Sequence, residues 1–232
     1  MKEKILFCWS GGKDSALALY QMQKSGSYDI FSILTTITKG YDRISMHGVR
    51  KELLQQQADS MGIDLIKVFI SKKSSNQEYE SKMRETLEEC KKKNNFRVAF
   101  GDILLEDLKK YREERLAEVG LEAIFPLWKR DTKELAHSFI DLGFKAVISC
   151  VNSKVLGKEF VGKDFDKEVL SKLPSNVDPC GENGEFHSFV YDGSIFKERI
   201  PYKLGEIVLR NEHFYYCDLI PLDSVNYYSQ IE

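Results

Sequence analysis

The first half of the chain alternates short apolar runs with longer segments in which apolar residues recur every three or four positions. The short runs predict buried strands, and the periodic segments predict amphipathic helices. We expect strands over residues 5–9, 30–38, 65–70 and 98–104, and helices over residues 15–22, 49–61, 78–93 and 106–119. This alternation predicts a parallel, doubly wound sheet that helices cover on both faces, with right-handed crossovers.

The second half continues with a helix that Thr132 caps and Gly143 ends, followed by a strand over residues 146–151. Beyond this strand glycine and proline become frequent, and the remaining expected strands cover residues 186–191, 206–209 and 214–219. This change predicts a loop-rich α+β part that packs on the first sheet. We therefore expect an α/β domain over residues 1–130 and a smaller α+β domain over residues 131–232.

Two adjacent glycines, Gly11 and Gly12, lie between the first expected strand and the first expected helix. Glycine tolerates a positive φ and lets backbone N–H groups approach an anion, while the following helix presents unpaired N–H groups and the positive end of its dipole. The hydroxyls of Ser10 and Ser15 flank the glycines and can donate hydrogen bonds to phosphate oxygens. The loop is therefore a candidate phosphate site, with a ligand-free turn as the simpler alternative.

Two charged residues follow the glycines. Lys13 would supply a mobile positive charge to a departing pyrophosphate, and Asp14 would hold Mg²⁺ or cap backbone amides. A plain turn accounts for the glycines but not for this charged pair. The Walker pattern G-x-x-x-x-G-K-[ST] and the dinucleotide pattern G-x-G-x-x-G do not occur here, which excludes those two classes of nucleotide site.

A second cluster of chemically active side chains lies in residues 178–190, where proline and glycine predict a tight loop before a strand. Glu182, Glu185 and His187 crowd this loop and could bind ammonium, position an amine or act as a general base. A turn with solvated acids is the alternative. Cys180 lies in the same loop, but no second cysteine is near it in the sequence, so we rank thiol chemistry below these roles.

Composition narrows the class of protein. The formal net charge of −2 provides no global basic field of the kind that nucleic-acid binding requires. The five cysteines are scattered without a C-x-x-C pair, which argues against a zinc site or a disulfide framework. No apolar run is long enough for a signal peptide or a membrane span. We therefore expect a cytoplasmic protein with no membrane partner, for which composition disfavours a nucleic-acid partner while a local basic patch stays open.

Residues 10–15 resemble the signature of the PP-loop ATP pyrophosphatases, which cleave ATP between the α and β phosphates and leave an AMP-activated substrate. Residues 178–190 are similar to the DPCGE…GEFHT segment of the diphthine–ammonia ligase family. Further similarities to that family follow in order: Gly101-Asp102-Ile103, Tyr111-Arg112-x-x-Arg115, Pro126-Leu127-Trp128, residues 143–148 and Gly162-Lys163-Asp164. The resemblance covers nearly all of residues 4–222, so it is more specific than the loop alone.

This resemblance implies a PP-loop domain of the HUP type, followed by a substrate-binding domain. It implies an ATP-dependent ligase that uses Mg²⁺, adenylates a carboxylate with release of AMP and pyrophosphate, and transfers ammonia, with diphthine on a translation elongation factor as acceptor. The residues that it assigns to ATP are Ser10, Gly11, Gly12, Lys13, Asp14, Ser15, Gly101 and Asp102, with Asp14 as metal ligand. The residues that it assigns to catalysis are Lys13, Asp14, Glu182, Glu185 and His187.

Residues 46–50, Met-His-Gly-Val-Arg, differ from the segment typical of eukaryotic and archaeal members and have the form of bacterial relatives. The acceptor is therefore open between diphthine and a different carboxylate. Two other functions stay open: a PP-loop enzyme that acts on a bacterial metabolite or a tRNA base, and a non-catalytic nucleotide-binding protein. Arg112 and Arg115 are expected to face either phosphates or solvent, and the sequence specifies no oligomeric state.

Overall fold

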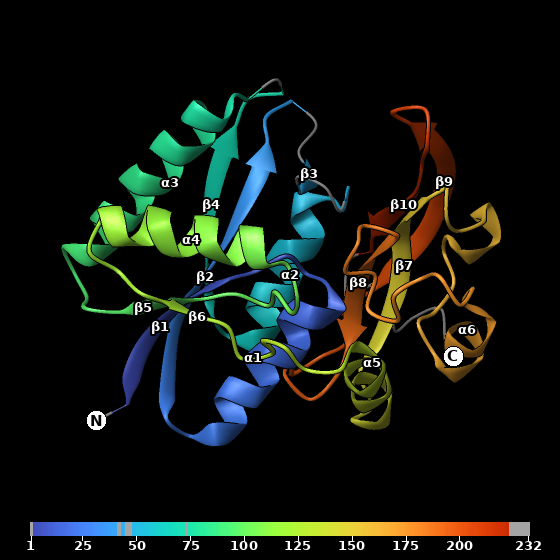
Figure 1. Ribbon diagram of the computed structural model, residues 1–232, viewed down its shortest axis with the longest axis horizontal. Helices are drawn as coiled ribbons and strands as arrows, with labels where there is room; N and C mark the ends of the chain where they lie inside the picture. The colour runs from blue at the N-terminus through green and yellow to red at the C-terminus, as the bar shows by residue number, and fades with distance from the viewer. Residues whose placement is uncertain (1, 41–42, 45–47, 73, 223–232) are drawn as a thin grey trace.

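The computed structural model describes residues 2–40, 43–44, 48–72 and 74–222, and it contains two sheets that lie side by side (Figure 1). The parallel strands of the first sheet are β1 (Glu3–Cys8), β2 (Tyr28–Thr38), β4 (Asp64–Ile70), β5 (Arg97–Ala99) and β6 (Ala123–Ile124). A short strand, β3 (Arg43–Ile44), pairs antiparallel with the end of β2. The helices of this half are α1 (Lys13–Ser25), α2 (Lys51–Met61), α3 (Asn76–Lys91) and α4 (Glu106–Glu118).

The order of strands in the first sheet reverses at β1. The chain runs from β1 outward to β2 and β4, then returns to β5 on the other side of β1. In open α/β sheets, ligands bind beyond the carboxyl ends of the strands at such a reversal. The register places Phe7 beside Ala99 here, so the residues after Cys8 and after Ala99 border the same space.

The second sheet is antiparallel and has the order β8-β7-β10-β9. Its strands are β7 (Lys145–Asn152), β8 (Phe186–Asp192), β9 (Tyr202–Arg210) and β10 (Phe214–Pro221). The helices of this half are α5 (Thr132–Asp141), a 3-10 turn (Lys158–Phe160) and α6 (Lys167–Lys172), and Figure 1 shows α6 on the outer side and α5 below the strands. No helix in the described part of the chain is long and apolar enough to cross a membrane.

Alternating side chains of β1 pack into two different clusters. Leu6 points to the face that α3 and α4 cover, where it joins Leu87 and Leu116. Ile5 and Phe7 point to the opposite face, into the cluster that contains the buried side chains of α1 and α2. Burial of both sides of β1 explains why its sequence is a continuous apolar run rather than an alternating one.

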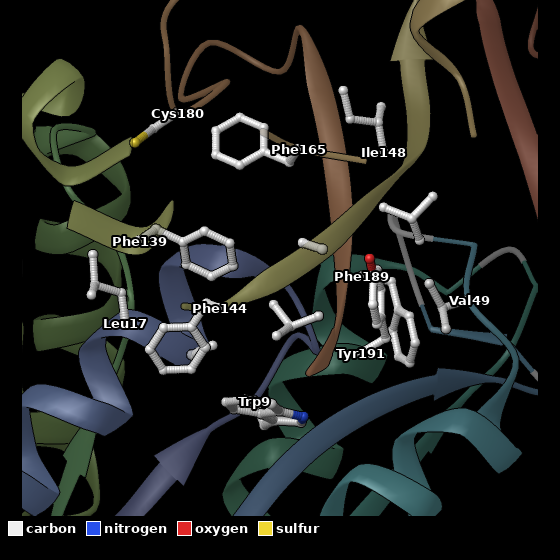
Figure 2. Close-up of a cluster of buried hydrophobic side chains, with 14 of the residues drawn as sticks. Trp9, Leu17, Val49, Phe139, Phe144, Ile148, Phe165, Cys180, Phe189 and Tyr191 are labelled. Carbon is white, nitrogen blue, oxygen red and sulfur yellow. The ribbon is translucent and has the colours of Figure 1, made fainter. Parts of the chain in front are cut away.

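The cluster on the α1 face extends without a break into the second sheet. Figure 2 shows Leu17 beside Phe139 and Phe144, with Trp9 below them and Phe189 and Tyr191 of β8 to the right. The ring centroids of Phe139 and Phe144 lie 5.2 Å apart in a stacked arrangement. The two sheets therefore share one hydrophobic core, with α1 between them.

The predicted α/β class and the doubly wound sheet are confirmed, but several boundaries differ. The strand expected over residues 98–104 ends at Ala99, and the residues after it form a loop that borders the site. Asp131, not Thr132, caps α5, because its carboxylate accepts a hydrogen bond of 2.8 Å from the Glu134 N–H. The short elements β3, β6 and α6 carry no recognisable periodicity and were not expected.

An ion-pair cluster joins the start of α2 to the second sheet. Asp218 of β10 accepts hydrogen bonds from Arg50 at 2.9 and 2.7 Å and from Arg43 at 2.8 Å. Arg43 also donates to the Gly48 carbonyl at 2.8 Å. The hydrogen bonds from Arg50, followed by those from Arg43, lower the pKa of Asp218 to about 2. This cluster holds residues 48–50 against β10. Met46 and His47 lie outside the described residues.

We expect Asp218→Asn to lower the free energy of unfolding by about 1–3 kcal/mol at pH 7, because the lowered pKa reports stability that the charged carboxylate contributes. A depressed pKa contributes stability above the unfolded value of about 4, and this contribution is lost as pH falls towards about 2. Urea unfolding at pH 7, 5, 4 and 3 measures this, with Asp64→Asn on the exposed start of β4 as control. A difference that does not shrink below pH 4 would contradict the ionic origin.

Candidate functional site

The loop between β1 and α1 has the conformation that its glycines permit. Gly11 has a φ of 78°, and a Cβ there would lie 2.8 Å from a Leu54 methyl carbon and 3.0 Å from Gln57 Oε1. The Ser10 and Ser15 hydroxyl oxygens are 2.7 Å apart, and Ser10 Oγ accepts a hydrogen bond of 3.2 Å from the Gly12 N–H. Glycine is therefore required at position 11 for both backbone conformation and space.

Gly101 brings the end of β5 against the first turn of α1. A Cβ on Gly101 would lie 2.9 Å from the Ser15 backbone nitrogen and 3.0 Å from its Cα. Backbone atoms cannot move aside as a flexible side chain can, so any larger residue would push the loop after β5 away from α1. This close approach brings Asp102, which the resemblance assigns to ATP, beside the phosphate loop.

Gln57 of α2 stabilises the phosphate loop by a hydrogen bond to the Gly11 carbonyl. The sequence interpretation missed this residue. It is fully buried on α2, and its Oε1 accepts a hydrogen bond of 2.8 Å from the Trp9 indole N–H. Its Nε2 donates to the Gly11 carbonyl at 3.2 Å and to the Val190 carbonyl at 2.6 Å. A glutamine among the apolar core positions of α2 is the signal that could have identified it, because buried polar groups require partners.

Strand β8 of the second sheet runs beside the phosphate loop. The Val190 N–H donates to the Gly11 carbonyl at 2.9 Å. The Lys13 N–H, at the start of α1, donates to the hydroxyl oxygen of Ser188 at 3.2 Å. Ser188 was also not predicted, since its position opposite α1 depends on how the two sheets pack.

The expectation that Lys13 is a mobile charge is wrong. Its side chain is only 4% exposed, and Nζ donates to the two Asp14 carboxylate oxygens at 2.9 and 2.8 Å and to the Cys180 carbonyl. Burial alone would lower the pKa of Lys13, but the Asp14 carboxylate and other nearby acids outweigh it and raise that pKa. Lys13 is therefore a fixed cation that links the phosphate loop to the loop at Cys180.

Glu185 is also placed differently from the expectation, because it braces its own loop instead of facing a substrate. It is 4% exposed and is not among the residues that line the cavity. One carboxylate oxygen accepts hydrogen bonds of 3.0 Å from the Asp178 N–H and from the Asn183 amide, and the other accepts one of 2.9 Å from the Asn183 N–H. These three bonds hold the loop that presents Glu182.

Glu182 connects the second sheet's loop to the first sheet. Its Oε2 accepts hydrogen bonds from the N–H groups of Ile103 at 3.2 Å and Leu104 at 3.1 Å. Burial, followed by the negative charge of Asp14, raises the pKa of Glu182 to about 7. Burial, followed by the charge of Lys13, lowers the pKa of His187 to about 4. Near neutral pH, His187 is therefore uncharged and Glu182 exchanges its proton readily.

Asp102 and Arg112 form an ion pair at the opposite wall of the site. Arg112 Nε lies 2.8 Å from Asp102 Oδ2, and its Nη2 donates to Oδ1 at 3.2 Å. The guanidinium carbon lies 4.3 Å from the centre of the Phe100 ring. Arg112 thus faces the cavity, whereas Arg115 pairs with Glu118 at 2.7 Å and lines a separate small pocket.

These groups surround a cavity of about 570 Å³. It opens at the carboxyl ends of β1, β2 and β5, on the side where the loop of residues 180–188 covers the first sheet. The predicted residues that line it are Ser10, Gly12, Lys13, Asp14, Ser15, Gly101, Asp102, Glu182 and His187. Among the described lining residues, Lys13 pairs with Asp14 and Arg112 with Asp102, so Glu182 is the lining carboxylate that forms no ion pair.

Two cysteines in this region have little thiolate character. Burial raises the pKa of Cys8 to about 12 and raises the pKa of Cys180 well above its usual range. The Cys180 thiol donates to the Thr132 carbonyl at 3.2 Å. Because thiolates rather than thiols are nucleophiles and metal ligands, neither cysteine is arranged for such chemistry.

Comparison with known proteins places this site in a family context. Residues 1–123 match the family model described as the diphthamide synthase N-terminal domain, and residues 131–219 match its C-terminal counterpart. A Schizosaccharomyces pombe protein named diphthine–ammonia ligase is 24% identical over 223 residues, which cover 88% of this chain and 37% of that relative. A Danio rerio protein of the same name is 24% identical over 225 residues, covering 88% of each chain.

One solved structure also aligns with the chain. It is described as a predicted subunit of tRNA methyltransferase from Methanocaldococcus jannaschii, and it gives a TM-score of 0.42 at 17% identity. The alignment covers 63% of this chain and 78% of that one. This likeness is too weak to support a statement about function.

We expect Gln57→Leu to lower the free energy of unfolding by about 2–5 kcal/mol, because in the core it removes the hydrogen-bond acceptor of the Trp9 N–H and a donor to each of the Gly11 and Val190 carbonyls. It should also weaken nucleotide binding, since the Gly11 carbonyl loses one of its two donors. Gln55→Leu on the same helix is the control, and it should change the free energy by about 0.5 kcal/mol or less. Urea unfolding and titration with ATP measure both effects. Equal losses in the two variants would contradict this role of Gln57.

Proposed function

Because the chain belongs to the family of diphthamide synthase domains, we propose that it is an ATP-dependent ligase that adenylates a carboxylate and transfers ammonia to it. The observation that carries this proposal is the position of the glycine loop. It lies at the strand reversal of the first sheet, at the N-terminus of α1, and opens into the cavity that Glu182 borders from the other side. An anion at the loop and an amine at Glu182 would then meet in one space.

ATP fits this space by size and by chemistry. The volume of about 570 Å³ falls within the range of about 300–1,000 Å³ that small-molecule sites occupy. The N-terminal N–H groups of α1 and the hydroxyls of Ser10 and Ser15 favour phosphate oxygens. Asp14 beside phosphate would repel it, but Lys13 neutralises that carboxylate at 2.8 Å. The pair thereby leaves the loop attractive to an anion.

Mg²⁺ also suits the residues present. The Asp14 side chain is 27% exposed and lines the cavity, and Mg²⁺ is commonly held by one or two carboxylates together with substrate phosphates and water. No group of three His, Cys, Asp or Glu side chains in the described ranges gathers to hold a metal by itself. When bound with ATP, the ion would neutralise phosphate charge.

The reaction proposed is a two-step acyl transfer. A carboxylate oxygen of the acceptor attacks the α-phosphorus of ATP, the bond to the β-phosphate breaks, and pyrophosphate leaves. Ammonia then attacks the acyl carbon, AMP leaves with the carboxylate oxygen, and one proton is released. We assign to Lys13 and the α1 N-terminus, which line the cavity, the stabilisation of the charge that develops on the phosphates. Positioning of the reactants within the cavity would supply the remaining acceleration.

We assign to Glu182 the binding and deprotonation of ammonium. Ammonium must lose a proton before nitrogen can attack, and a base with a pKa of about 7 is well matched to accept one at neutral pH. Glu182 is the unpaired carboxylate of the cavity, so its charge also attracts a cation. His187 is neutral at this pH and can donate or accept a hydrogen bond without adding charge.

The acceptor that family membership favours is diphthine on a translation elongation factor, and a different carboxylate is the alternative. Sulfur insertion into tRNA is disfavoured, because the raised pKa of Cys8 and the buried thiol of Cys180 leave no reactive thiolate at the cavity. We also propose that the ATP-binding part and the substrate-binding part divide near residue 130. The chain leaves the first sheet after β6 and enters α5 at Thr132, which supports this boundary.

The products identify the reaction. We expect the protein, incubated with ATP, ammonium and a diphthine-bearing elongation factor, to form AMP and pyrophosphate in equal amounts with an amide. Nucleotide chromatography and intact-protein mass spectrometry measure these products. Omission of ammonium should leave ATP–pyrophosphate exchange but no amide. Formation of ADP and phosphate instead would contradict cleavage between the α and β phosphates of ATP. If ATP–pyrophosphate exchange occurred only with other carboxylic acids and not with diphthine, the acceptor would be one of those acids.

We expect Glu182→Gln to lower amide formation by about 10²–10⁴-fold, the usual contribution of a general base, while ATP–pyrophosphate exchange persists. Glutamine keeps an oxygen that can accept from Ile103 and Leu104, so the loop stays in place. In the unmodified protein, amide formation should rise with pH through about 7, and the variant should lose this rise. Glu134→Gln on the exposed side of α5 is the control. Equal loss of exchange and amide formation would assign Glu182 to adenylation.

A further inference from the structure

The two edge strands of the antiparallel sheet, β8 and β9, have different hydrogen-bond partners. At one edge, β8 is covered by the phosphate loop, where the Val190 N–H donates to the Gly11 carbonyl at 2.9 Å. At the other edge, β9 pairs with β10 alone among the described residues. The backbone groups on the outer side of β9 therefore have no strand partner within the described ranges. Such an edge is a template for pairing with another strand.

The outer edge also carries an apolar stripe. Leu204, Ile207 and Leu209 are 53%, 38% and 51% exposed. The register places them opposite Leu219, Cys217 and Tyr215 of β10. A bulge between Leu204 and Ile207 takes up one extra residue of β9, so the three lie on one face of the sheet. Leu219 and Cys217 are buried. The exposed side chains of β9 therefore extend the apolar face of β10 to the edge of the sheet. Exposed edge strands are usually protected by charge and not extended by apolar side chains.

The residues at the end of β9 are complementary to themselves. They read Glu206-Ile207-Val208-Leu209-Arg210, with an acid and a base flanking three apolar residues. If two copies pair antiparallel about Val208, Glu206 of each lies opposite the partner's Arg210. The same pairing places Ile207 opposite the partner's Leu209. Opposite charges and apolar residues that face each other across strands both stabilise such a pair.

Only one register gives this match. Residues that lie directly opposite each other must project from the same face of the sheet. The partner of each residue can therefore change only by two positions at a time, which moves the centre of the pairing by one residue. A pairing centred on Ile207 places Glu206 opposite the partner's Val208 and leaves the charges unmatched. A pairing centred on Leu209 places Glu206 opposite the turn that follows β9 in the partner and again leaves the charges unmatched. The charges thus select the register centred on Val208.

We propose that two copies of this chain associate through β9, antiparallel and centred on Val208, so that their second sheets form one continuous sheet. This proposal does not depend on the proposed function, because β8 and the phosphate loop lie at the opposite edge of the same sheet. Each copy keeps its own cavity. Loss of the dimer should therefore leave ATP binding in place.

Charge reversal tests the register. Glu206→Arg alone and Arg210→Glu alone each place like charges opposite each other at both ends of the pairing. We expect each single variant to raise the dissociation constant of the dimer at least about tenfold. The double variant Glu206→Arg with Arg210→Glu restores opposite charges and should return the constant to near its original value. Sedimentation equilibrium over a range of concentrations measures this, against a monomer mass of 26.8 kDa.

Cross-linking provides a second and independent measurement. Val208→Cys places one thiol opposite its copy, at a spacing that a disulfide can bridge, and should give a covalent dimer on mild oxidation. Glu206→Cys, two positions away, is the matched control and should not. Circular dichroism and ATP titration show that each variant is folded. A chain that stays monomeric at every concentration, single reversals that dimerise as well as the original, or a double variant that fails to recover would each overturn the proposal.

Discussion

The phosphate loop is shaped by hydrogen bonds from both sheets at once, and the arrangement of the site depends on this. The Gly11 carbonyl accepts one hydrogen bond from Gln57 of α2 and another from the Val190 N–H of β8. Lys13, at the first position of α1, reaches Ser188 with its backbone and the Cys180 carbonyl with its side chain. Because α1 also packs between the two sheets, the loop takes hydrogen bonds and packing contacts from both halves of the chain.

Two of the three carboxylates that line the cavity, Asp14 and Asp102, form ion pairs, and the third, Glu182, does not. Lys13 with Asp14 and Arg112 with Asp102 are internal ion pairs that keep four charged side chains close to a small space. Buried pairs of this kind contribute little net stability, and their retention is consistent with a role in the site. Glu182 forms no such ion pair, and its burial, followed by the negative charge of Asp14, raises its pKa to about 7. The same feature that makes it costly in the fold suits it to exchange protons.

The antiparallel sheet serves two purposes through its two edges. The inner edge, β8, completes the site by lying along the phosphate loop, where its polar backbone groups find partners. The outer edge, β9, presents an apolar stripe and a charge pattern that matches its own copy. A strand edge must be covered or paired in some way, and this fold covers one edge with its own loop. The structure thereby separates the reaction site from the surface proposed for association.

The sequence by itself determined the α/β class, the position of the phosphate loop and the second loop before β8, because apolar spacing, glycines and prolines are local signals. It could not determine which side chains would be exposed. Lys13 proved buried and Glu185 proved to brace its own loop, while Gln57 holds the site without any motif. Tertiary structure decided these roles, because a polar side chain's burial and partners depend on distant segments that pack around it.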